Sequence, residues 1–297
     1  MIRVINEDDI DPQFRDPEFK RQIMPASDFV QEAIDFWHGE KTTATAVMPW
    51  PKTHDKIQFR PGEVTLWPGI NGHGKSLITS QIALHLRSLG MSSCIGSFEM
   101  QPAATFRRMA RQGICAELPT PQVLHKFAGW LGDAMWLYTV QGMVDRARLM
   151  TVMRYCAGKL GVSHFFVDSL MKCVRGVDDY NGQKDFIDQC CAVARDTGLH
   201  IHIVAHSRKL ASERDTPGKF DVAGAGAITD QVDNVITVWR NKSEKREEGT
   251  PDCLLCCDKQ RHGSSWEGKI GLWFEPRSQS FIESERGRPW QYVNGWE

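Results

Sequence analysis

One short segment constrains the fold of this chain more than any other: the octapeptide Gly69-Ile-Asn-Gly-His-Gly-Lys-Ser76. A run of strand-forming residues, Glu63–Trp67, precedes it, and a helical pattern from Lys75 to Leu89 follows it. Glycines at three positions of the loop let successive backbone amides point toward one centre, and the helix N-terminus adds partial positive charge. This strand, loop and helix unit is suited to hold a polyphosphate.

The chemistry of the loop assigns separate roles to its last two residues. We expect Lys75 to reach the β and γ phosphates of a nucleotide and the Ser76 hydroxyl to ligate Mg²⁺. The backbone of the whole loop is a candidate nucleotide cradle. Its residues are Gly69, Ile70, Asn71, Gly72, His73, Gly74, Lys75 and Ser76.

Two acidic residues stand at the ends of predicted strands. Phe165-Phe-Val-Asp168 reads as a buried strand with its carboxylate at the C-terminal edge, where a magnesium nucleotide needs one. Glu99 follows the strand Ser92–Ser97, and ligands of open α/β sheets gather at the carboxyl ends of strands. Glu99 is therefore a candidate to activate water, or else a first-turn acid of the helix that begins near Pro102.

Strand-like and helix-like segments alternate from Gly62 onward, which predicts an α/β fold with a mainly parallel sheet and helices on both faces. Four strands without intervening helices then follow, which predicts an antiparallel C-terminal extension. Helices are predicted at 75–89, 103–112, 143–160 and 184–195, and strands at 63–67, 92–97, 164–167, 200–205, 235–239, 253–257, 269–274 and 280–282.

The two ends of the chain differ in character from its centre. Residues 1–26 are polar and rich in proline, which predicts an arm without its own core. Residues 27–60 hold a short amphipathic helix, Asp28–His38, and a connection. The main domain is expected over 61–283 and a tail over 284–297. An apolar helical stripe so far upstream needs a partner surface.

Composition excludes several classes of protein. The net charge of −1 removes the electrostatic argument for a nucleic-acid coat protein, although contact with DNA through a few loops stays open. No apolar run approaches the ~18 residues of a membrane span, and no targeting signal is recognisable at the N-terminus. The nine cysteines are expected to be reduced. Cys253, Cys256 and Cys257 lie in an apolar run and are expected to be buried thiols rather than metal ligands.

Five ordered blocks resemble the RecA-like ATPase domain of the DnaB-like replicative helicases, most of all the Twinkle and phage primase-helicase branch. The resemblance covers roughly Asp28 to Glu283. The blocks are Gly69–Ser76, Ser97–Met100, Phe165–Asp168, His206–Lys209 together with Gly224–Asp233, and Asp258–Gly263.

The resemblance implies roles for matching residues. Glu99 matches the catalytic base, and His206 matches a polar sensor of the γ-phosphate. Lys259 and Arg261 match a Lys-x-Arg pair that reaches into the next subunit's nucleotide site. By themselves, these residues would be interpreted as ordinary strand-end residues. A finger of this kind implies a ring, usually a hexamer, and gives the Asp28–His38 helix a partner on the adjacent subunit.

The family also implies two loops that hold single-stranded DNA. The second corresponds to Asp221–Ile228, where Ala223 replaces the basic residue of many relatives. The alternative for all of these residues is a solvated flexible loop. The candidate DNA contacts are Lys172, Arg175, Lys209, Lys219, Gly224 and Gly226.

The sequence therefore predicts an ATP- and Mg²⁺-dependent, ring-forming DNA helicase motor that translocates on single-stranded DNA in replication. The prediction includes a cytoplasmic location, no membrane, a phage or mobile-element origin in a bacterial host, and a separate primase or loader, since no primase module is recognisable. Two alternatives stay open: a RecA- or RadA-like recombinase, and a nucleotide-gated accessory or loader with little turnover.

Overall fold

The computed structural model describes residues 25–31, 34, 45–176, 179–206, 228–242, 248–262 and 266–294. The chain divides into two compact units, Met1–Ala44 and Thr45–Glu297. In the first unit a 3-10 helix, η3, spans Ala26–Phe29, and residues 30, 31 and 34 are helical. The predicted amphipathic helix is thus present in its described part, and its remaining residues lie outside the description.

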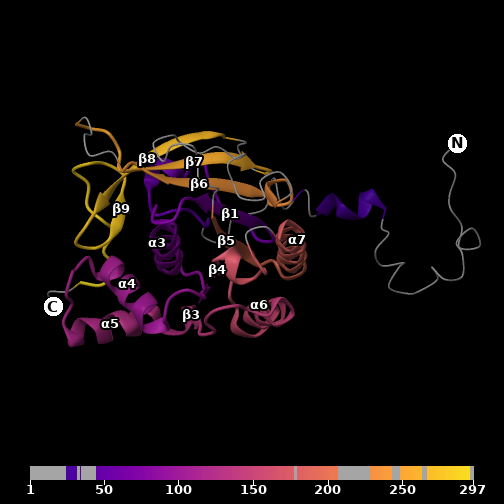
Figure 1. Cartoon of the computed structure of the whole chain (residues 1–297), viewed down its shortest axis with the longest axis horizontal. Helices are drawn as coiled ribbons and strands as arrows, with labels where there is room; N and C mark the ends of the chain where they lie inside the picture. The colour runs from indigo at the N-terminus through magenta and orange to yellow at the C-terminus, as the bar shows by residue number, and fades with distance from the viewer. Residues whose placement is uncertain are drawn as a thin grey trace, which may run out of the picture. The chain divides into compact units, whose positions relative to one another are not determined.

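A nine-stranded sheet organises the second unit (Figure 1). The strand order is β3-β2-β4-β5-β1-β6-β7-β8-β9. The pairs among β1 to β6 are parallel, and β6 to β9 pair in antiparallel fashion. The predicted parallel sheet with an antiparallel C-terminal extension is confirmed. The strands are Val64–Gly69 (β1), Ser93–Ser97 (β2), Met135–Tyr138 (β3), His164–Asp168 (β4), His200–His206 (β5), Asn234–Arg240 (β6), Cys253–Gln260 (β7), Gly268–Glu275 (β8) and Ser280–Ile282 (β9).

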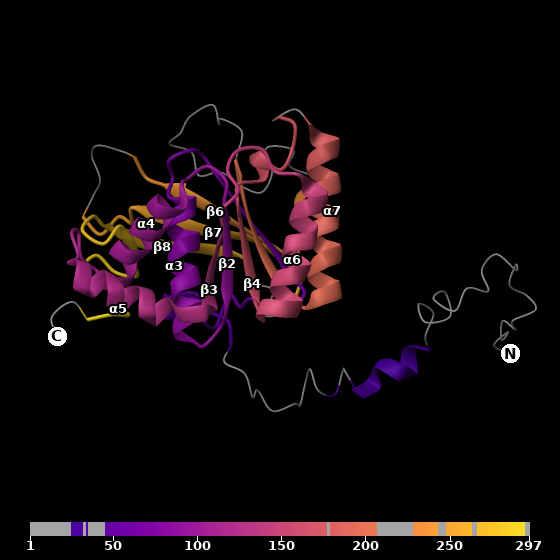
Figure 2. The same cartoon turned by 90° about the horizontal axis from the view of Figure 1, so that it is seen from below.

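Helices cover both faces of the sheet. The α3, α4 and α5 helices lie on one face and α6 and α7 on the other (Figure 2). The α6 helix shows how local sequence sets these bounds, because the Asp145 carboxylate accepts the Arg148 N–H at its start and Gly161 adopts φ +64° at its end. The α-helices are Lys75–Ser88 (α3), Pro102–Ile114 (α4), Pro121–Leu131 (α5), Arg146–Leu160 (α6) and Tyr180–Thr197 (α7); short 3-10 helices are Pro51–Thr53 (η4), Gly132–Ala134 (η5) and Leu170–Lys172 (η6).

Each face of the sheet has its own hydrophobic core. Adjacent residues of β4 divide between them: Phe166 packs into the core beneath α3, α4 and α5, and Phe165 into the core beneath α6 and α7. This division follows from the two-residue period of a strand. Because both faces are buried, the central strands are continuously apolar, as a parallel sheet requires.

Residues on either side of the expected main domain also contribute to the core. Met48 and Trp50 are almost fully buried, and the Trp50 indole donates to the carbonyl of Phe281 at 2.8 Å. Near the other end, the Tyr292 ring stacks on Trp130 with centroids 5.2 Å apart. The connection and the tail expected from sequence therefore include segments, 45–60 and 284–294, that pack against the sheet and its helices. Neither segment has the periodicity that signals a helix or a strand.

The sequence patterns missed two elements, α5 and β3. The α5 helix begins after Thr120, whose hydroxyl accepts the Val123 N–H at 3.4 Å, with Pro121 at the first helical position. The β3 strand has only four half-buried residues, too few for a clear alternation. The predicted thiols of Cys253, Cys256 and Cys257 are buried in β7. Within the part of the chain described, no helix is both long and apolar enough to cross a membrane.

Candidate nucleotide-binding site

A cleft of about 450 Å³ opens at the carboxyl ends of the parallel strands. It combines the phosphate loop after β1 with residues that follow β2, β4 and β5. These strands are neighbours in the sheet, although they are far apart in the chain. The lining residues are Asn71, Gly72, Gly74, Lys75, Ser76, Leu77, Glu99, Arg108, Asp168, Lys172, Val204, His206 and Arg240.

The glycines of the phosphate loop are required by its geometry. Gly74 has φ +89°, and a Cβ there would lie 2.9 Å from the ring of Phe281. A Cβ on Gly69 would lie 2.4 Å from the carbonyl oxygen of Val238. Larger residues would force the loop away from β6 and β9, so these glycines allow the backbone to form a cradle.

The Lys75 side chain lies folded into its own loop. Its ammonium donates to the carbonyl oxygens of Gly69 at 2.7 Å and Ile70 at 3.0 Å. The residue is 6% exposed, and burial lowers the pKa of Lys75 to about 8 despite the nearby carboxylates of Asp168 and Glu99. A buried ammonium with two carbonyl partners is ready to accept the charge of a phosphate.

Ser76 and Asp168 meet at the floor of the cleft. The Ser76 hydroxyl hydrogen-bonds to the Asp168 carboxylate, and burial raises the pKa of Asp168 although Ser76 and Arg108 oppose the shift. A desolvated carboxylate beside a hydroxyl is a donor set of oxygen atoms, which Mg²⁺ prefers. These two residues fit a magnesium ion, as the sequence predicts.

A serine links the two remaining predicted residues of the cleft. The Ser169 hydroxyl donates to the Glu99 carboxylate at 2.9 Å and lies 3.4 Å from His206 Nε2. The His206 ring itself is 3.9 Å from the Glu99 carboxylate, and burial lowers the pKa of His206. Ser169 was missed by sequence reasoning, and its position directly after Asp168 is the only local signal for it.

His73 belongs to the loop but does not line the cleft. Its ring is fully buried, and Nδ1 accepts the backbone N–H of Arg240 at 3.0 Å. The Arg240 guanidinium lies over the ring of Phe274, 4.7 Å from its centroid, and lines the cleft. His73 therefore fastens the loop to the end of β6, a role that the sequence did not indicate.

Arg108 is a second residue that sequence reasoning missed. It reaches the cleft from α4, donates to the Met100 sulfur, and favours the charged form of Asp168. Burial lowers the pKa of Arg108, and Asp168 opposes that shift. Its helical position gave no sign that its side chain turns toward the strand ends.

Lys259 and Arg261 lie at the opposite edge of the sheet. Asn234 is level with Thr65 near the start of β1 and with Gln260 near the end of β7. The phosphate loop follows Gly69 at the other end of β1, roughly 13 Å further along the strand. Neither residue lines the chain's own cleft.

The predicted DNA contacts divide into two groups. Lys172 lines the nucleotide cleft, and the Arg175 backbone N–H donates to the Asp179 carboxylate at 3.1 Å. The structure does not bring these two side chains to a surface with the other candidates, because Lys209, Lys219, Gly224 and Gly226 lie outside the described residues.

The sheet order and the phosphate loop define the RecA-like NTPase fold. Residues 56–212 match the AAA domain family, and the chain belongs to this family.

Two solved structures have a similar fold. The ATPase domain of a phage helicase is 14% identical with a TM-score of 0.72, covering 88% of this chain and 98% of that one. A DnaB-like replicative helicase, described with its interactions with primase, is 12% identical with a TM-score of 0.72, covering 92% of this chain and 71% of that one. The predicted RecA-like fold of DnaB-like helicase ATPase domains is confirmed.

Proposed function

We propose that the protein is an ATP-dependent, ring-forming DNA helicase motor that translocates on single-stranded DNA. The observation that carries the proposal is the division of the predicted site between two edges of one sheet. Lys75, Asp168, Glu99 and His206 share one cleft, whereas Arg261 lies at the opposite edge and cannot complete that cleft within the same chain. A second copy can complete it.

Within the cleft, each residue has a defined task. Bound Mg²⁺ would neutralise charge on the β and γ phosphates. Ser76 and Asp168 would hold this ion, and Lys75 would exchange its two loop carbonyls for phosphate oxygens. Glu99 would orient the attacking water, with Ser169 fixing its carboxylate. His206, joined to Glu99 through Ser169, would report the presence of the γ-phosphate to the residues that follow β5.

Arg261 would supply positive charge to the neighbouring subunit's site. A guanidinium acting in trans stabilises charge in the transition state of phosphoryl transfer. The similar folds of the phage helicase ATPase domain and the DnaB-like replicative helicase support a ring of this kind and a replicative role. A hexamer, a phage origin and a separate primase or loader belong to the same proposal.

The first experiment measures steady-state ATP hydrolysis with and without single-stranded DNA, with Lys75→Ala as the blank. A motor requires strong stimulation by DNA. A DNA-independent rate would overturn the motor proposal in favour of a nucleotide-gated accessory, and filaments in electron micrographs would favour a recombinase.

A mixing experiment tests the shared site. Arg261→Ala alone and Lys75→Ala alone should each abolish hydrolysis, and Arg261→Ala should still bind nucleotide. Mixed rings should regain activity, because one subunit supplies the guanidinium and the other supplies the phosphate loop. Failure to regain activity at every mixing ratio would contradict a site shared between subunits.

A further inference from the structure

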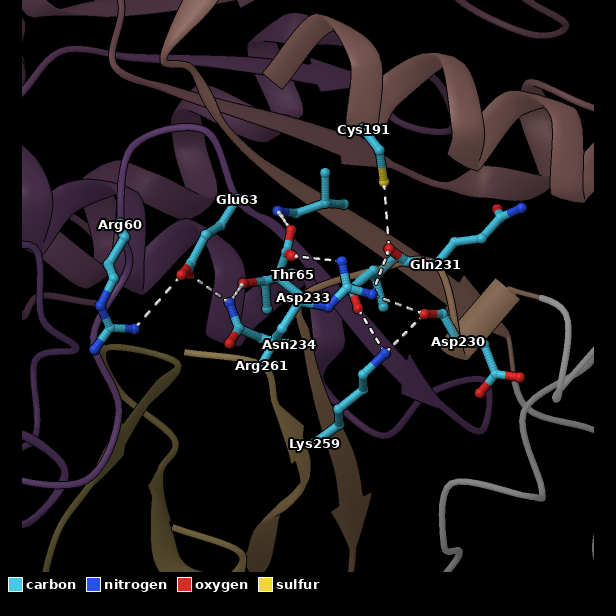
Figure 3. Close-up of polar contacts among 12 residues, drawn as sticks. Arg60, Glu63, Thr65, Cys191, Asp230, Gln231, Asp233, Asn234, Lys259 and Arg261 are labelled. Atoms are coloured by element: carbon cyan, nitrogen blue, oxygen red, sulfur yellow. Dashed lines mark hydrogen bonds and ion pairs between the residues drawn. The ribbon is translucent and has the colours of Figure 1, made fainter. Parts of the chain in front are cut away.

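The ends of β7, β6 and β1 meet in a network of polar contacts on the side of the sheet away from the nucleotide cleft (Figure 3). Lys259 and Arg261 reach this network from the end of β7. Their partners belong to residues 229–233, the short segment that precedes β6. This segment is close in sequence to residues 207–227, which contain four of the predicted DNA contacts.

Lys259 uses its full donor capacity within its own chain. Its ammonium donates to the carbonyl oxygens of Thr229 at 2.8 Å, Asp230 at 2.9 Å and Val232 at 2.8 Å. An ammonium group has three N–H donors, so no donor is left for a phosphate. Burial lowers the pKa of Lys259, with Arg261 as the next cause, so the site does not favour extra exposed charge. We call these three hydrogen bonds the carbonyl clamp.

Arg261 is held differently and retains donors. One terminal nitrogen pairs with the Asp233 carboxylate at 3.2 Å, and the other donates to the carbonyl oxygens of Asp230 at 3.0 Å and Gln231 at 3.4 Å. The side chain is 41% exposed. A guanidinium has five N–H donors, so Arg261 can contact a phosphate while part of this network persists.

Asp233 fixes the network to the sheet. Its second carboxylate oxygen accepts the Val64 N–H at 2.9 Å, and its side chain is 12% exposed. The Asp233 carbonyl also accepts the Arg261 N–H at 2.8 Å. Because both ends of Asp233 are bound, the start of β1, the segment 229–233 and the end of β7 form one connected unit.

We propose that Lys259 is a positioning residue and makes no contact with the nucleotide. Its carbonyl clamp holds residues 229–232 in the shape that presents Arg261, and Arg261 alone supplies charge to the neighbouring site. The part that concerns Arg261 rests on the function proposed above. The clamp also lies between the predicted DNA segment and Arg261, so a DNA signal to the shared site has to pass through it.

Hydrogen exchange tests the clamp without any reference to ATP hydrolysis. In Lys259→Met, the backbone amides of residues 229–233 should exchange about tenfold faster or more in the nucleotide-free protein, because the clamp no longer restrains them. Lys259→Arg should show the same change, since a planar guanidinium does not converge on three carbonyls as an ammonium does. Lys269→Met, which removes an exposed lysine from β8, is the matched control and should leave exchange unchanged.

Hydrolysis assays then separate a positioning role from a phosphate contact. Lys259→Met should lower the ratio of DNA-stimulated to DNA-free kcat about fivefold or more, whereas loss of general stability would lower both rates alike and preserve the ratio. A phosphate contact predicts the opposite pattern, in which Lys259→Arg keeps hydrolysis and exchange at 229–233 is normal. That result would overturn the proposal.

The two proposals fail in different ways. Without ATP hydrolysis in the wild-type protein the proposed function fails, yet faster exchange at 229–233 in both Lys259 variants would still support the clamp. With DNA-stimulated hydrolysis but unchanged exchange in Lys259→Met, the motor stands and the clamp is refuted.

Discussion

The affinity of the cleft for magnesium nucleotide should decrease above pH 8 because of Lys75. In the empty cleft, burial lowers the pKa of Lys75 from 10.5 to about 8. Bound phosphates favour the charged ammonium and raise this pKa again. Binding therefore takes up a proton at alkaline pH, and the dissociation constant should be about tenfold weaker at pH 9 than at pH 7.

Calorimetric titration with a non-hydrolysable ATP analogue and Mg²⁺ measures this effect. Titrations at pH 9 in two buffers of different ionisation enthalpy should show the uptake of close to one proton. Lys75→Arg is the control, because a guanidinium stays charged throughout this range and its affinity should not change with pH. A dissociation constant for the wild-type protein that is constant from pH 7 to pH 9 would refute the reasoning.

Three further results are expected. Burial lowers the pKa of His200 to about 4, so its contribution to stability is complete above pH 6.5, decreases as the pH falls toward 4, and should be reduced by about 2 kcal/mol at pH 5; urea unfolding at pH 7 and pH 5 checks this, and equal midpoints would contradict it. Gly74→Ala should abolish nucleotide binding, whereas Gly90→Ala, at φ +84° with open space around its Cβ, should bind normally and only lose about 1 kcal/mol of stability. Ser169→Ala should lower kcat about tenfold without changing KM, because it releases the Glu99 carboxylate; an unchanged kcat would exclude the proposed link.

Sequence patterns succeeded where the cause is local. The octapeptide at 69–76 predicted its own loop and the flanking β1 and α3, because glycine conformation and hydrophobic periodicity act over a few residues. The alternation of strands and helices likewise predicted the parallel sheet. By contrast, α5 and β3 were missed, since one is short with a weak stripe and the other is only half-buried.

The sequence by itself determined that the chain forms a parallel α/β sheet with a phosphate loop, and it placed Asp168 and Glu99 at strand ends. Only the tertiary structure decided what lies beside these residues. Strand order brings Ser169 to Glu99, and antiparallel pairing carries Lys259 back to the carbonyls of residues 229–232. Contacts between distant segments depend on strand order and register, and a single sequence does not encode these in any local pattern.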